Sequence, residues 1–144
     1  MSQTIVITSA DSIIAPGIFE LQVPLAEPLE LPGLWSMNLL EVDFTSTSNG
    51  EPLYLYTNMV EPTVIGSGQF QILDTVYSSG GSAYQAYRVQ NPPSLKQVAF
   101  QSVTFMEFTF RNGQGQIPTP VAGAGETVIT IQIQQLSTDT FLSV

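Results

Sequence analysis

The sequence predicts an all-β protein folded as a single eight-stranded jelly roll, in which two four-stranded antiparallel sheets pack face to face. Three observations lead to this fold class. Apolar and polar residues alternate in many short windows, which is the period of a half-buried strand. β-branched and aromatic residues fill these windows, as they do in strands. Clusters of Gly, Pro, Asn and Ser separate the windows at intervals of mostly 10 to 20 residues, the spacing of a sandwich or barrel.

Eight windows carry the strand pattern. Ile129, Ile131 and Ile133 occupy every second position of the last window, and Phe108 and Phe110 mark another strongly apolar one. No window of a dozen residues has the 3.6-residue period of a helix. Eight strands in 144 residues fit a jelly roll. The pattern alone does not separate this fold from an immunoglobulin-like sandwich, although that sandwich usually has fewer strands and a shorter chain. The predicted strands are residues 3–8, 18–23, 36–44, 53–60, 70–77, 84–89, 102–110 and 127–134.

The whole chain, residues 1–144, is expected to form one domain, because it contains neither an internal repeat nor a linker. Residues 24–32 contain three prolines and are expected to cross between the sheets as an extended connector. Residues 136–144 combine Ser, Thr and Asp with Phe141 and Leu142, so they form either a docking tail or a frayed end.

The surface of this protein carries unusually little charge. Only 10% of the residues are charged, although 43% are apolar and the net charge is −9. An ordinary soluble domain is about 25% charged. Neutral Ser, Thr, Gln and Asn must therefore finish the surface, and they cost less to desolvate than charged groups. Such a surface favours a protein that works inside an assembly.

The cations and the metal-binding residue types exclude several classes of function. Arg88, Lys96 and Arg111 are the only basic residues, too few and too scattered for direct binding to nucleic acid or to an anionic membrane. The chain has no Cys and no His, so zinc, haem and thiol chemistry lose their usual ligands and we expect no cofactor. The first residues lack the features of a signal peptide, and no apolar run is long enough for a membrane helix. We therefore expect a protein that is not secreted and not inserted in a membrane.

Catalysis or ion binding would have to depend on carboxylates. Glu41 and Asp43 lie two residues apart on one predicted strand and could form the acid/base pair of a hydrolase. The same spacing is also that of a solvated strand face, which is the interpretation we favour, so we predict that the protein is not an enzyme. Glu27, Glu30 and Glu51 could supply oxygen ligands to calcium, but no dense Asp/Asn loop accompanies them.

Aromatic residues and glycine turns admit two interpretations each. Trp35 is interpreted as a core or interface anchor, with a sugar-stacking platform as the alternative. The five tyrosines could line a carbohydrate site, although Tyr is also a good strand residue; they are Tyr54, Tyr56, Tyr77, Tyr84 and Tyr87. Asn112, Gly113 and Gly115 are expected to form a hairpin turn, because no helix follows that could make them a phosphate loop.

Two segments carry a more specific pattern. Residues 54–66 read YLYTNMVEPTVIG, a tyrosine-rich strand that ends in a polar residue and is followed by Val-x-Pro and Gly. Residues 91–134 contain a proline loop, a strand, the turn NGQGQIP and a final alternating strand. Together these segments resemble the penton, the single jelly-roll vertex (minor capsid) protein of Polinton-like viruses, adintoviruses and virophages. Asn58 stands where that pattern has an acidic residue.

The resemblance implies a structural protein of the virion. It implies a homopentamer at the icosahedral fivefold vertices, in contact with a double-jelly-roll major capsid protein, made in the cytoplasm or nucleus of a host cell. We expect the loops of residues 62–68 and 112–118 to lie at subunit contacts. The residues that mark these loops are Pro62, Gly66, Gly68, Asn112, Gly113 and Pro118.

Three other functions are compatible with the same sequence. One is a carbohydrate-binding or receptor-binding jelly-roll module that uses the tyrosines and Trp35. The second is a capsid cement or spike-base protein of the same structural class, which would be trimeric. The third is a small hydrolase that uses Glu41 and Asp43.

Overall fold

The computed structural model describes residues 2–13, 19–45, 52–77, 84–88, 95–118 and 127–136. These residues form strands and one 3-10 turn, η1 (Ser9–Asp11), and none of them lies in an α-helix. Within these ranges no helix has the length and apolarity that a membrane crossing requires. Glu51, the predicted turns around 15–17, 48–50, 78–81 and 91–93, and nearly all of the predicted tail of residues 136–144 lie outside the described residues.

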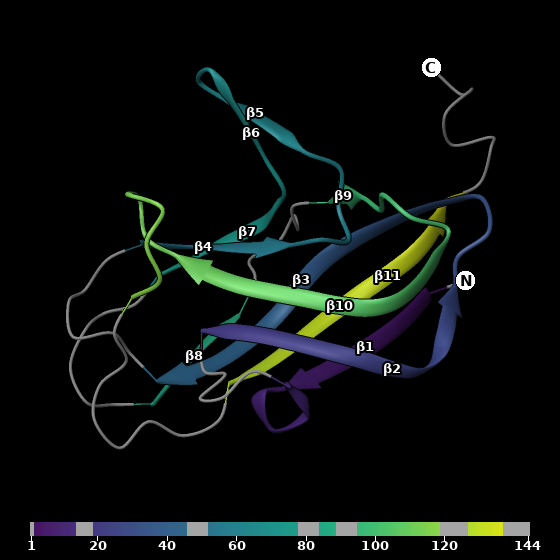
Figure 1. The fold of residues 1–144 in the computed structure, drawn as a ribbon, viewed down its shortest axis with the longest axis horizontal. Helices are drawn as coiled ribbons and strands as arrows, with labels where there is room; N and C mark the ends of the chain where they lie inside the picture. The colour runs from purple at the N-terminus through teal and green to yellow at the C-terminus, as the bar shows by residue number, and fades with distance from the viewer. Residues whose placement is uncertain are drawn as a thin grey trace.

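Eight long strands form two antiparallel sheets that face each other (Figure 1). The first, here called the β1 sheet, has the order β1-β11-β3-β8, and the short β9 also pairs with β3. The second, the β2 sheet, has the order β2-β10-β4-β7. The strands are β1 (Ser2–Thr8), β2 (Glu20–Glu30), β3 (Leu34–Thr45), β4 (Pro52–Thr57), β7 (Ile72–Tyr77), β8 (Tyr84–Arg88), β9 (Lys96–Gln97), β10 (Ser102–Arg111) and β11 (Val128–Leu136). A separate two-stranded sheet consists of β5 (Thr63–Ile65) and β6 (Gly68–Phe70).

The pairing of the eight long strands is that of a jelly roll. In chain order, the first strand pairs with the eighth, the second with the seventh, the third with the sixth and the fourth with the fifth. This long hairpin is rolled up so that β11 also pairs with β3 and β10 with β4. The predicted fold class is therefore confirmed.

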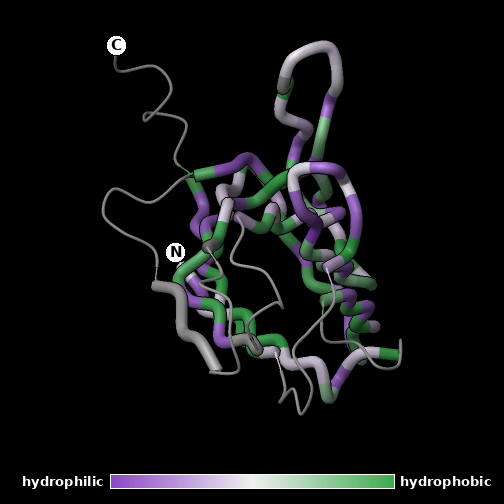
Figure 2. Tube along the Cα trace, turned by 90° about the vertical axis from the view of Figure 1, so that its left-hand side faces the viewer, coloured by the Kyte–Doolittle hydropathy of each residue, from purple (hydrophilic) through white to green (hydrophobic). Residues whose placement is uncertain are grey.

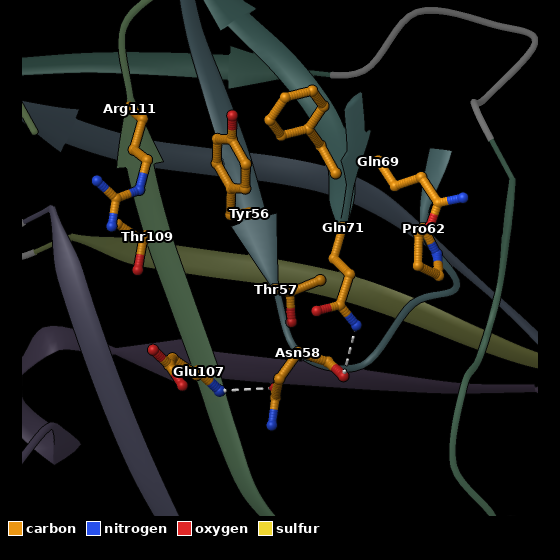
Figure 3. Close-up of a pocket in the computed structure, with 10 residues that line it drawn as sticks. Tyr56, Thr57, Asn58, Pro62, Gln69, Gln71, Glu107, Thr109 and Arg111 are labelled. Carbon is orange, nitrogen blue, oxygen red and sulfur yellow. Dashed lines mark hydrogen bonds between the residues drawn. The ribbon is translucent and has the colours of Figure 1, made fainter. Parts of the chain in front are cut away.

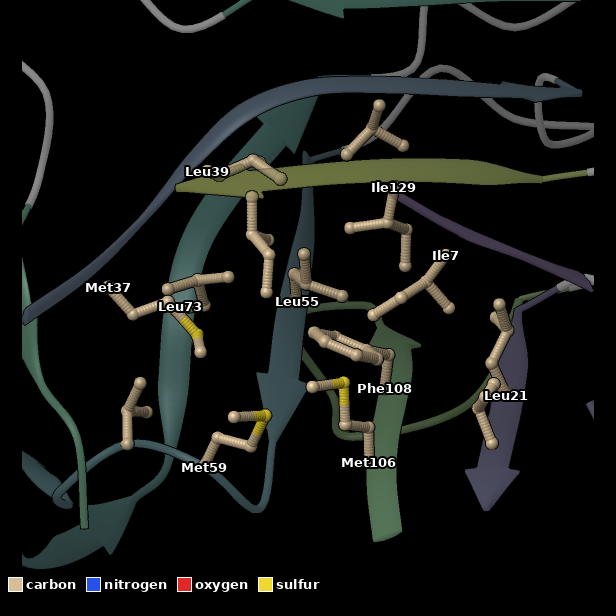
Figure 4. Packing of buried hydrophobic residues seen from close by; sticks show 14 of the residues in the cluster. Ile7, Leu21, Met37, Leu39, Leu55, Met59, Leu73, Met106, Phe108 and Ile129 are labelled. Carbon is tan, nitrogen blue, oxygen red and sulfur yellow. The ribbon is translucent and has the colours of Figure 1, made fainter. Parts of the chain in front are cut away.

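Alternation along the strands builds the core between the sheets. On β10, Met106, Phe108 and Phe110 are buried in the core, whereas Glu107 on the opposite face of the strand is partly exposed. Ile129, Ile131 and Ile133 of β11 are completely buried in the opposite layer. Figure 4 shows side chains from both layers meeting between the sheets. Burial of each large side chain contributes about 1.5–3 kcal/mol, so this period-two pattern is the main source of stability.

The short segment of residues 96–99 joins the two sheets at one side of the sandwich. On one side it pairs with β3, where the Val98 amide donates to the Trp35 carbonyl over 2.9 Å. On the other side it bonds to the chain that leaves β4: the Ala99 amide donates to Met59 O over 2.8 Å, and the Glu61 amide to Gln97 O over 2.9 Å. Val60 and Val98 form the corresponding antiparallel bridge. This segment fixes the course of the chain just after β4.

The proline-rich segment departs from the prediction. The expected connector of residues 24–32 is in fact the second half of β2, which runs to Glu30. β2 is an edge strand, so a missing proline N–H on its open side leaves no ladder partner unpaired. Pro24 pairs with Phe105 and Leu29 with Val103, so four residues of β2 lie opposite the single residue Thr104. This bulge is larger than the usual two residues opposite one, and it accommodates the proline-rich sequence within the sheet.

Trp35 is a core residue. Only 5% of it is exposed, and its indole Nε1 donates a hydrogen bond to the Pro32 carbonyl over 2.9 Å. The core-anchor interpretation is confirmed. The alternative, a sugar-stacking platform, is wrong because a buried ring has no free face for a ligand.

Asp74 is a half-buried acid within the β2 sheet. It pairs in register with the buried Leu55. Burial raises the pKa of its carboxyl above the ordinary value of 3.8, although the hydrogen bond from the Thr75 amide and the charge of Lys96 lower it. The raised pKa means that the folded state favours the neutral acid. Stability gained in this way is present below pH 3.8 and is lost as the pH rises through the folded-state pKa.

The substitution Asp74→Asn should therefore stabilise the protein at neutral pH, because the amide keeps an acceptor for Thr75 and removes the buried charge. Thermal unfolding followed by circular dichroism should give a higher midpoint for the variant at pH 7. The gain should vanish below pH 3.8, where the wild-type carboxyl is also neutral. An equal gain at both pH values would show that the charge is not the cause.

Candidate functional site

A groove on the outer face of the β2 sheet lies between the two loops that the sequence singles out. One wall is the hairpin of β5 and β6, here called the β5–β6 arm (residues 63–70). The other wall is the turn of residues 112–116, which follows β10. Figures 1 and 2 show the arm and this turn projecting from the same end of the molecule.

The groove consists of two adjoining hollows of about 390 Å³ and about 420 Å³. Tyr56 and Phe70 line both of them. The first hollow (Figure 3) reaches along β10 to Glu107 and Arg111. The second is more apolar and extends from Tyr54 and neighbouring residues of β4 and β7 to the 112–116 turn.

The aromatic wall has a defined geometry. The rings of Tyr56 and Phe70 meet edge to face, with centroids 6.3 Å apart and an interplanar angle of 81°. The Arg111 guanidinium carbon lies 5.9 Å from the centroid of the Tyr56 ring, a cation–π arrangement. Phe70 remains 39% exposed, so the wall presents apolar surface to the outside.

The Asn58 side chain fixes the point at which the chain leaves the sheet. β4 ends at Thr57, and β10 then lacks a partner strand on that side. The Asn58 amide takes the place of that partner. Its Nδ2 donates to Phe105 O over 3.1 Å, and its Oδ1 accepts from the Glu107 amide over 3.0 Å. The resemblance implied an acid here, but an ionised carboxylate could only accept, whereas the amide both donates and accepts.

Gln71 fixes the other end of the arm. Its Nε2 donates to Val60 O over 3.0 Å, and its backbone carbonyl accepts from the Thr57 amide over 3.0 Å. The arm therefore leaves from Asn58–Val60 and returns at Gln71, with both ends hydrogen-bonded together. The sequence analysis did not identify Gln71 as a residue of this site. The available signal was a polar residue near the start of the predicted strand of residues 70–77.

The arm itself needs glycine at two positions. Gly66 lies at the tip with φ 60°, in the left-handed region that favours glycine. A Cβ atom on Gly68 would lie 2.7 Å from the Phe70 ring, so the missing side chain makes room for that ring. Pro62, which precedes the arm, lines the first hollow. Pro62, Gly66 and Gly68, predicted to mark a contact loop, thus place one wall of the groove.

The opposite wall is shaped by Asn112. Its Oδ1 accepts hydrogen bonds from the amides of Gln114 and Gln116, both over 3.0 Å, and its backbone carbonyl accepts from the Gly115 amide. Arg111 Nη1 donates to Gly115 O over 2.9 Å. The left-handed glycine is Gly115, with φ 79°. Gly113, which the sequence pattern emphasised, does not have a positive φ.

The expected hairpin at Asn112–Gly113 is wrong as a connection between paired strands. β10 belongs to the β2 sheet and β11 to the β1 sheet, and they do not pair. The turn instead begins the crossing between the two layers. Asn112 and Gly113 line the second hollow, whereas Pro118 is buried.

The other candidate residues lie away from the groove. Glu41 and Asp43 are on β3 in the other sheet, and Glu41 pairs in register with Arg88 of β8. Glu27 and Glu30 lie on β2, where Glu30 accepts a hydrogen bond from the Ser102 hydroxyl over 3.1 Å. Among the described residues, no three His, Cys, Asp or Glu side chains gather in a way that could hold a metal ion.

Of the five tyrosines, Tyr54 and Tyr56 line the groove. The side chains of Tyr77, Tyr84 and Tyr87 lie outside the described part of the structure.

No protein-family model matches this chain, and no curated protein is similar to it at a significant level. The functional interpretation therefore depends on the residues and the fold themselves.

The double role of Asn58 leads to a prediction for Asn58→Asp. The carboxylate can still accept from the Glu107 amide, but it cannot donate to Phe105 O and places a negative charge beside that carbonyl. Urea unfolding at neutral pH should give a loss of about 1–3 kcal/mol. Because a protonated carboxyl can donate again, the loss should shrink at acidic pH. Asn58→Ala, which loses both bonds, should lose a similar amount at every pH, and equal behaviour of the two variants would contradict this role.

Proposed function

We propose that the protein is a structural capsid subunit of the penton type, which forms homopentamers at the fivefold vertices of a viral shell. One observation carries the proposal. Described parts of the two segments of the resemblance, residues 54–66 and 95–118, are directly bonded to each other at one end of the jelly roll. β4 pairs with β10, Val60 bridges to Val98, and Asn58 bonds to the backbone of β10. These parts of the matching pattern thus meet at the groove, whereas its last strand, β11, lies in the β1 sheet.

The surface supports an assembly role. A chain with 10% charged residues desolvates its outer faces at low cost when copies pack together. The side chains of Asn58, Gln71 and Asn112 make hydrogen bonds to backbone groups around the groove. Their role there is to hold turns and chain ends in place. We therefore infer a role in virion architecture that needs neither catalysis nor a cofactor. The partners would be other copies of the chain and a double-jelly-roll major capsid protein.

Native mass spectrometry of the purified chain tests the proposal directly. A homopentamer has a mass of about 78 kDa, five times the chain mass of 15.6 kDa. The trimeric alternative, a cement or spike-base protein, would give about 47 kDa, three times that mass. A protein that stays monomeric at high concentration and is missing from purified particles would overturn the proposal.

A carbohydrate-binding module is the second candidate, because Tyr54, Tyr56 and the partly exposed Phe70 line the groove. Trp35, the other residue of that hypothesis, is buried and takes no part. If the groove bound a glycan, a glycan array should give a signal that Tyr56→Ala abolishes. Trp35→Phe, which keeps an aromatic ring in the core, is the matched control and should leave that signal unchanged.

A further inference from the structure

The β5–β6 arm exposes apolar surface without charge. Val64, in the middle of β5, is 67% exposed. From Pro62 to Leu73 the sequence contains no charged residue, in a chain whose net charge is −9. Two copies of a protein with this net charge repel each other wherever their acidic residues approach. The arm is a part that a second copy can approach without that repulsion.

The arm is held in place before any partner arrives. Only three residue pairs join its strands, from Thr63 with Phe70 to Ile65 with Gly68, and so short a hairpin is marginal by itself. Its base supplies the missing support, through the Gln71 side chain, the Glu61 amide and the packing of Phe70 on Tyr56. A fixed protrusion loses little conformational entropy when it binds, which favours association.

The groove beside the arm has the complementary character. Its second hollow is lined by Tyr54, Tyr56, Phe70 and Ile72 on one side and by residues 112–115 on the other. Arg111, one of only three cations in the chain, lines the adjoining hollow. Glu107 lines that adjoining hollow as well, so its charges are balanced, and no charged residue lines the second hollow. An aromatic hollow without charge suits an uncharged apolar segment of another copy.

We propose that the groove of each copy receives the tip of the β5–β6 arm of the next copy, with Val64 packed against Tyr54 and the 112–115 turn. The proposal rests on the proposed ring assembly and names the contact that builds it. The exposed Val64 is not part of the groove lining, so a contact between Val64 of one copy and the groove of the next can be head-to-tail and close into a ring. Val64 and the groove lie close together in one subunit. Near the rotation axis of a ring, the two contact surfaces of each subunit are likewise close together.

Engineered cysteines give a direct test, because the chain has none of its own. Val64→Cys and Gln114→Cys, prepared separately, mixed and oxidised, can join only between copies. The proposal predicts disulfide-linked heterodimers that contain one copy of each variant. Thr104→Cys, at an exposed position opposite the bulge of β2, replaces Val64→Cys as the control and should give no such product. Absence of the heterodimer from a mixture that assembles normally would overturn the proposal.

A charge substitution provides the second measurement. Val64→Asp should weaken association roughly tenfold or more, because the interface loses a buried valine and gains an acid. Thr104→Asp adds the same charge elsewhere and should leave association unchanged. Far-UV circular dichroism should report a folded protein for both, since both positions are exposed.

The outcomes separate this inference from the proposed function. A wild-type pentamer that Val64→Asp leaves intact would overturn the arm contact and leave the penton role standing. A wild-type protein that does not associate at all would overturn both.

Discussion

The hydrogen bonds around the end of β4 are the constraint on which the rest of this structure depends. β10 continues beyond β4, so its carbonyl and amide at Phe105 and Glu107 would lose their partners there. The Asn58 amide satisfies both, and the chain is free to turn away from the sheet. Where the chain returns to the sheet, the Gln71 side chain donates a hydrogen bond to Val60 O. A buried or half-buried backbone group without a partner costs about 1–3 kcal/mol, so this junction holds the arm in one direction. The direction of the arm in turn places Phe70 on Tyr56 and creates the groove.

The low charge of the chain has a consequence for function as well as for folding. Charged side chains normally keep a sandwich soluble and prevent its edge strands from pairing with other chains. Here the charge is sparse and mostly negative, and the three cations are spread over β8, β9 and β10. A surface of Ser, Thr, Gln and Asn is easily covered by other protein. This property supports the proposed place in a shell, where neighbouring subunits would cover much of the surface.

Much of the fold could be predicted from the sequence, because alternation reports directly on which residues face the core. All eight long strands overlap predicted windows, although the window of residues 18–23 covers only the start of β2, and Trp35 lies in the core as expected. β5, β6 and β9 were not predicted, because two or three residues are too few for a pattern. Pro24 and Pro28 suggested a connector, since the sequence alone cannot tell that β2 is an edge strand with a bulge. The loops at 62–68 and 112–118 were named, but their meeting around one groove depends on the pairing of β4 with β10. The side-chain bonds of Asn58 and Gln71 likewise depend on residues that are distant in sequence.

The proposed contact between copies joins the arm of one copy to the 112–116 turn of the next. Hydrogen–deuterium exchange of the assembled and the dissociated protein measures this most directly. In the dissociated protein the β5–β6 ladder should exchange quickly, because its three residue pairs form a short hairpin that projects into water. Assembly should slow exchange at Thr63–Ile65 and at 112–116, and leave the bulge around Thr104 unchanged. Protection that appears on other faces, while the arm continues to exchange at its dissociated rate, would contradict the account.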